Sequence, residues 1–137
     1  MRAAVVFFTG NHDSQLRKLA GALVKGMEKQ GAFVDLIDGE RDVNTVLTIY
    51  DYISVGAGSA TGMGGSVGKK VTQFLANAGI VTGKRSFAFV SNRGLRKAKT
   101  LSSLMKAMEF EGMYLKNSSI LISEEDAERV GHELHLS

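Results

Sequence analysis

The 137-residue sequence contains no cysteine, no proline and no tryptophan. The absence of cysteine excludes disulfides, thiolate metal sites and a cysteine nucleophile. Without proline, the turns must be built from glycine, asparagine and aspartate, so the 16 glycines mark the loops. The apolar run at 3–8 is too short to span a membrane, and no signal-peptide cleavage pattern follows it. We therefore expect a single cytoplasmic domain covering residues 1–137.

Acidic residues are missing from a long part of the chain. The net charge is only +3, but residues 69–106 contain nine lysines and arginines and no aspartate or glutamate. Such a stretch favours an anionic partner, or it forms a solvated basic helix face. The sequence leaves both interpretations open.

Apolar runs alternate with segments of helical periodicity. Runs typical of buried strands occur at 3–8, 33–37, 50–56, 85–91 and 118–123. Apolar residues spaced three and four apart predict helices over 14–30, 67–78 and 101–108, and a short helix capped by Ser123. Gly31, Gly79 and Gly112 follow the first three helices as stop signals. For the segment around 41–46, the sequence does not decide between a loop and a short helix. This order predicts a parallel sheet with helices on both faces.

Ligands of such sheets bind beyond the carboxyl ends of the strands, where the loops at 9–14, 57–66 and 91–95 lie. The first loop consists of Thr9, Gly10, Asn11, His12, Asp13 and Ser14. Its backbone N–H groups, two hydroxyls and the start of a helix are suited to holding a phosphate. The alternative is a plain turn in which Asp13 or Ser14 caps the helix.

The run Thr9-Gly10-Asn11 before a helix resembles the phosphate-binding turn of flavodoxins, Ser/Thr-x-Thr-Gly-x-Thr. The likeness covers nearly the whole chain: 50–56 resembles the third flavodoxin strand, 58–61 the start of the first flavin-flanking loop, and 89–94 the fourth strand with the second loop. The resemblance implies a flavodoxin-like α/β fold, which is a doubly wound five-stranded parallel sheet of order 2-1-3-4-5 with helices on both faces.

It also implies a flavin mononucleotide (FMN) held non-covalently, with its phosphate on residues 9–14. One side of the flavin ring would face Ser59, Ala60, Thr61 and Gly62, and the other side would face Asn92, Arg93 and Gly94. The flavin would carry the redox chemistry, so the resemblance implies electron transfer without a catalytic side chain. The expected partner is then a redox protein with an acidic surface. Nucleic acid and membrane partners are not expected, and the oligomeric state is open.

Two positions of the turn depart from the family pattern, since Phe7 and His12 stand where hydroxyl residues would lie. The flanking loops offer Met63 and Leu95 in place of aromatic residues. These departures support an alternative, a degenerate binding or regulatory module that no longer holds FMN tightly and uses its basic stretch. A third possibility is a flavin-dependent reductase with the loop 57–66 as a lid. No metal site is predicted, because His132 and His135 are two ligands near the end of the chain.

Overall fold

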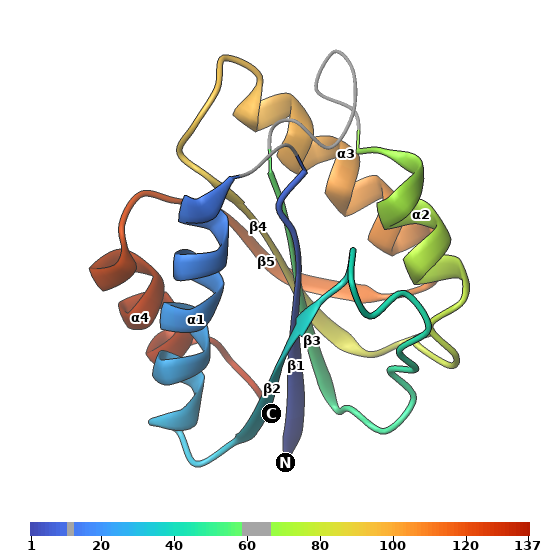
Figure 1. The fold of residues 1–137 in the computed structure, drawn as a ribbon. Helices are drawn as coiled ribbons and strands as arrows, with labels where there is room; N and C mark the ends of the chain where they lie inside the picture. The colour runs from blue at the N-terminus through green and yellow to red at the C-terminus, as the bar shows by residue number, and fades with distance from the viewer. Residues whose placement is uncertain (11–12, 59–66) are drawn as a thin grey trace.

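The computed structural model describes residues 1–10, 13–58 and 67–137. Its strands form one parallel sheet in the order β2-β1-β3-β4-β5, which confirms the predicted fold (Figure 1). The strands are β1 (Arg2–Phe8), β2 (Phe33–Asp38), β3 (Tyr52–Ala57), β4 (Arg85–Ser91) and β5 (Tyr114–Leu121). The helices are α1 (Ser14–Glu28), α2 (Lys69–Ala76), α3 (Lys97–Phe110) and α4 (Glu124–Glu133). None of these helices is long and apolar enough to cross a membrane.

Helices cover both faces of the sheet: α1 and α4 lie on one side and α2 and α3 on the other (Figure 1). Side chains of β1 therefore alternate between two cores. Val5 and Phe7 belong to the core that contains the apolar residues of α1. Val6 and Phe8 belong to the core that contains those of α2 and α3. Burial on both faces explains why β1 is apolar throughout, without the period-two pattern of a half-exposed strand.

The helices α1 and α4 approach each other closely through two glycines. A Cβ atom at Gly26 would lie 2.0 Å from the carbonyl oxygen of Glu128, and one at Gly131 would lie 2.4 Å from that of Leu23. No larger residue fits either position at this spacing. This contact fixes α4 beside α1, and the start of α1 belongs to the predicted phosphate turn.

The predicted helix stops are confirmed at Gly31 and Gly112, whose φ angles are 90° and 85°. Such positive angles strain any residue with a side chain, which is why glycine follows these helices.

The strand β5 begins at Tyr114, four residues before the predicted start at 118. It pairs with β4 alone and most of its side chains are at least partly exposed, so Lys116 and Asn117 are accommodated without an apolar pattern. Such an edge strand gives little signal in sequence. Residues 39–51 form turns and no helix.

This irregular segment is held in place by Lys84, which precedes β4. The Lys84 Nζ donates to the carbonyl oxygens of Thr48, of Tyr50 at 2.6 Å and of Leu47 at 3.3 Å. Leu47 and Tyr50 are buried in the core beneath α2. One member of the basic stretch is therefore a structural residue at the amino edge of the sheet.

Candidate functional site

The described residues that begin the three predicted loops lie together at the carboxyl edge of the sheet. Phe8 pairs with Ala57 and Ala57 pairs with Val90, so the residues that follow these three positions lie at one level. The Gly58 N–H donates to the Phe8 carbonyl at 2.8 Å. A Cβ at Gly58 would lie 2.6 Å from the carbonyl oxygen of Thr9. The turn after β1 therefore packs directly against the residue that follows β3.

Asp13 joins this turn to both α1 and β4. Its Oδ1 accepts from the Leu16 N–H at 3.0 Å, which makes it the N-cap of α1, as one of the two predicted caps. Its Oδ2 accepts from the Ser91 hydroxyl at 2.7 Å. The residue is 8% exposed, and its carboxylate is an acceptor in both bonds. Asp13 thus ties the start of α1 to the end of β4 through Ser91, a residue that the sequence reasoning missed.

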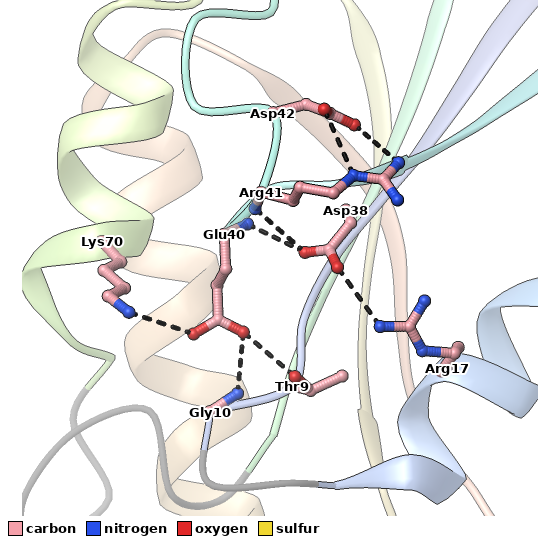
Figure 2. A network of polar contacts seen from close by, with 8 residues as sticks. All are labelled: Thr9, Gly10, Arg17, Asp38, Glu40, Arg41, Asp42 and Lys70. Atoms are coloured by element: carbon pink, nitrogen blue, oxygen red, sulfur yellow. Dashed lines mark hydrogen bonds and ion pairs between the residues drawn. The ribbon is translucent and has the colours of Figure 1, made fainter.

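Glu40 lies against the start of the same turn. Its Oε1 accepts from the Thr9 hydroxyl at 3.0 Å and from the Gly10 N–H at 3.1 Å. Its Oε2 lies 3.8 Å from the Nζ of Lys70, which is in the first turn of α2 (Figure 2). The Glu40 side chain is 20% exposed. Two donors of the predicted phosphate turn therefore hold a carboxylate.

The sheet register brings Glu40 to this position. Phe7 pairs with Asp38, so two residues further along each strand Thr9 and Glu40 lie side by side. Gly39 lets the chain pass over β1, because a Cβ there would lie 2.3 Å from the ring of Phe8. The sequence reasoning missed Glu40, although β2 ends at the same edge as β1. The sequence signal that could have identified Glu40 is its position two residues after the end of β2, the strand that pairs with β1.

A second carboxylate organises the segment after β2. Asp38 Oδ1 accepts from the N–H groups of Glu40 at 3.0 Å and of Arg41 at 3.3 Å, and its Oδ2 accepts from Arg17 at 3.2 Å (Figure 2). The Asp42 carboxylate hydrogen-bonds Arg41 and raises the pKa of that guanidinium. The backbone around Glu40 is thus fixed by bonds that do not involve its own side chain.

A pocket of about 480 Å³ lies at the start of α1. It brings together three predicted site residues from two separate loops, namely Ser14, Asn92 and Arg93, with Lys18. Two of these side chains are cationic, and Gln15, Ile122 and Glu124 complete the lining. Gly94 follows with a φ of 81°, and Leu95 beyond it is fully exposed.

Other predicted site residues, Asn11, His12, Ser59, Ala60, Thr61 and Gly62, lie outside the described residues. Within the described ranges, no group of three or more His, Asp or Glu side chains is arranged to hold a metal ion.

The arrangement suits an anion. A hydroxyl and a backbone N–H at the end of a buried strand already hold an anionic oxygen, which is a carboxylate where a ligand phosphate would present the same type of acceptor. Lys70 places a positive charge beside Glu40, and Arg93 places another at the pocket that Ser14 lines. The donors of Thr9 and Gly10 therefore fit a phosphate group chemically once the Glu40 carboxylate has moved away from them.

No model of a protein family matches the sequence, and no curated protein matches it. Solved structures do. Oxidised flavodoxin 1 from Bacillus cereus aligns with a TM-score of 0.74 at 15% identity, over 96% of this chain and 95% of that one. A short-chain flavodoxin associated with a PDU bacterial microcompartment aligns at 0.72 and 18% identity, over 96% and 92%. Two-electron reduced Megasphaera elsdenii flavodoxin aligns at 0.65 and 16% identity, over 93% and 96%.

Proposed function

The chain has the flavodoxin-like fold, and from this premise we propose that it binds FMN non-covalently at the carboxyl edge of its sheet and takes part in electron transfer. The observation that carries the proposal is the pair of hydrogen bonds from Thr9 and Gly10 to an anionic oxygen. A phosphate monoester offers the same kind of acceptor, and a helix N-terminus stabilises its charge.

The phosphate is assigned to residues 9–14. Thr9 and Gly10 donate from the end of β1, Ser14 adds a hydroxyl at the start of α1, and Asn11 and His12 complete the turn. Asp13 acts differently, because its carboxylate accepts from Leu16 and Ser91 and ties the start of α1 to the end of β4.

The flavin ring is assigned to the space between the other two loops. Ser59, Ala60, Thr61 and Gly62 take one side of the ring, and Asn92, Arg93 and Gly94 take the other. Leu95 supports this assignment, since a fully exposed leucine next to the second loop offers an apolar contact for a ring. Bound FMN supplies electron-transfer chemistry, while the chain binds it, orients it and limits its contact with water. No side chain is assigned an acid or base role.

The distribution of the basic stretch supports an acidic redox partner. Arg93, Arg96 and Lys99 are exposed after β4, at the edge that carries the proposed site. Lys84 and Arg85 lie at the opposite edge, where β4 begins. An acidic partner surface would be steered toward the first group by long-range attraction, which salt weakens.

The proposal is tested by titrating the flavin-free protein with FMN and following the loss of flavin fluorescence. We expect binding at micromolar FMN, and no binding in that range would contradict the proposal. Thr9→Val removes one phosphate donor and should weaken FMN binding about fivefold to tenfold while leaving riboflavin, which has no phosphate, unaffected. Thr82→Val, at the other edge of the sheet, is the matched control and should bind FMN like the unmodified protein.

One observation favours a second function, a binding module without flavin: the Thr9 and Gly10 donors are already satisfied by Glu40. In that case Arg93 and its basic neighbours would bind an anionic protein surface. Salt-dependent binding of poly-glutamate, together with no binding of FMN, would favour this function over the first.

A further inference from the structure

Glu40 occupies the same two donors that the proposed function gives to the phosphate. The Thr9 hydroxyl has one proton to donate and the Gly10 amide has one, and both point at a single oxygen of Glu40. A phosphate cannot bind them while the carboxylate stays, and two anions at this distance repel each other.

We infer that Glu40 is a built-in competitor of the phosphate: a phosphorylated ligand binds only when the Glu40 side chain leaves Thr9 and Gly10. Residue 40 then sets how strongly the site prefers a phosphorylated ligand to an unphosphorylated one. The identity of that ligand as FMN rests on the proposed function, but the competition for the two donors does not.

The contacts of Glu40 allow its side chain to leave without a change of fold. Its backbone is held separately, since its N–H donates to Asp38 Oδ1 at 3.0 Å. The carboxylate lies at the surface end of the sheet and belongs to neither apolar core. Release therefore requires a rotation of one side chain, and the strand β2 keeps its register with β1.

Lys70 can pair with an anion both before and after Glu40 leaves the two donors. Its Nζ lies 3.8 Å from Glu40 Oε2, and the Lys70 side chain is 74% exposed. After release, Lys70 can stay paired with the carboxylate or turn to the incoming phosphate. Both arrangements keep a cation beside an anion at the start of α2, so the cost of release comes mainly from the two charge-assisted bonds to Glu40.

The experiment compares the unmodified protein with Glu40→Gln and uses Glu109→Gln as the matched control. Glu109 is an exposed glutamate near the end of α3, so this variant makes the same change of charge away from the turn. Each protein is titrated with inorganic phosphate, FMN and riboflavin. The Gly10 amide signal in nuclear magnetic resonance reports phosphate binding, and flavin fluorescence reports the other two ligands.

We expect Glu40→Gln to bind phosphate and FMN about tenfold more tightly than the unmodified protein, because a neutral amide holds the donors less strongly and does not repel the ligand. Riboflavin should bind equally to both, and Glu109→Gln should match the unmodified protein throughout. Glu40→Ala, which removes the competing acceptor altogether, should give at least the same gain.

Unchanged or weaker phosphate binding in both Glu40 variants would overturn the inference, as would an equal gain for riboflavin. If the variants gain phosphate affinity at Gly10 but none of the proteins binds FMN, the inference holds and the proposed function fails. If all proteins bind FMN with equal affinity, the proposed function holds and the inference fails.

Discussion

Ser91 at the end of β4 donates a 2.7 Å hydrogen bond to Asp13 at the start of α1, across 78 positions of sequence. Both residues are buried, with exposures of 1% and 8%. A buried carboxylate that loses a partner keeps an unmet demand for a hydrogen bond, so this bond stabilises the arrangement of the two loops. It links the proposed phosphate turn to the loop proposed for one side of the ring.

We expect Ser91→Ala to lower the free energy of unfolding by about 1–3 kcal/mol, which is the usual cost of an unsatisfied buried group. Asp13→Ala should cost at least as much, because it also removes the cap of α1. Urea denaturation of the two single variants and the double variant gives their coupling energy, expected at about 1 kcal/mol or more. Ser102→Ala, an exposed serine in α3, should change stability by less than about 0.5 kcal/mol. Strict additivity at 13 and 91 would show that the bond contributes nothing.

The cations at the pocket should strengthen FMN binding. Arg93→Gln and Lys18→Gln each remove one charge near the start of α1, and we expect each to weaken FMN binding about twofold to fivefold at low salt. Because positive charge favours a more negative reduced flavin, Arg93→Gln should also lower the midpoint reduction potential of the bound cofactor. Lys106→Gln, on an exposed position of α3, should leave both quantities unchanged. A potential that rises in Arg93→Gln would contradict the assigned position of this side chain.

Leu95 should respond to an aromatic substitution. If it faces the flavin ring, Leu95→Trp adds a stacking surface worth about 0.5–1.5 kcal/mol, or roughly a twofold to tenfold gain in affinity. The gain should be the same for FMN and riboflavin, which separates this effect from the phosphate-dependent effect of Glu40. Ile80→Trp places the same side chain at an exposed position before β4 and should change neither affinity. Fluorescence titration measures all four values, and an equal response of the two variants would rule out a ring contact at Leu95.

Two glycines of α1 offer a matched comparison of packing. Gly26→Ala forces a methyl group against the Glu128 carbonyl 2.0 Å away, and we expect a loss of about 1–3 kcal/mol or more in unfolding free energy. Gly21→Ala meets nothing within 4 Å and should raise stability by about 0.5–1 kcal/mol through helix propensity. Thermal or urea unfolding measures both. A Gly26→Ala protein as stable as Gly21→Ala would show that α1 and α4 can move apart freely.

Tyr50 makes the stability depend on alkaline pH. Its hydroxyl donates to Asp35 at 2.6 Å, and burial, followed by this bond and the charge of Asp35, raises the pKa of Tyr50 to about 12. A raised pKa stabilises the folded state fully below pH 10 and progressively less as the pH rises from about 10 to about 12. Burial also raises the pKa of Tyr52, so Tyr50 is tested through its own variant. Tyr50→Phe should make the decline between pH 10 and 12 less steep in urea unfolding, and parallel curves would contradict this origin.

The elements with local signals were predictable from sequence. The strand β1 is apolar on both faces, and Asp13 and Ser123 cap the helices that follow them, as expected. The start of β5 was missed because Lys116 and Asn117 lie on an edge strand, where exposed polar residues carry no period. The local sequence pattern thus identified the buried strands and the capped helices. It failed to locate the start of β5, an edge strand most of whose side chains are at least partly exposed.

The candidate site was predictable only in part. Thr9, Asp13 and Arg93 were predicted from loops that directly follow β1 and β4. Glu40 reaches Thr9 through the pairing of β2 with β1, which the order of residues alone does not display. Lys84 was counted with the basic stretch, but it binds carbonyl groups at the opposite edge. A count of charged residues along the chain does not show at which edge of the sheet each charge lies.

Residue 40 lies beside the proposed ligand site and outside the apolar cores that stabilise the fold. Glu40 adds no side chain to either apolar core, whereas the glycine before it and the strand it follows are fixed by their neighbours. By the inference above, an exchange at this position changes which ligand the site accepts and leaves both apolar cores untouched. Chains that share this fold can therefore differ in the ligand they accept through one substitution that lies outside both cores.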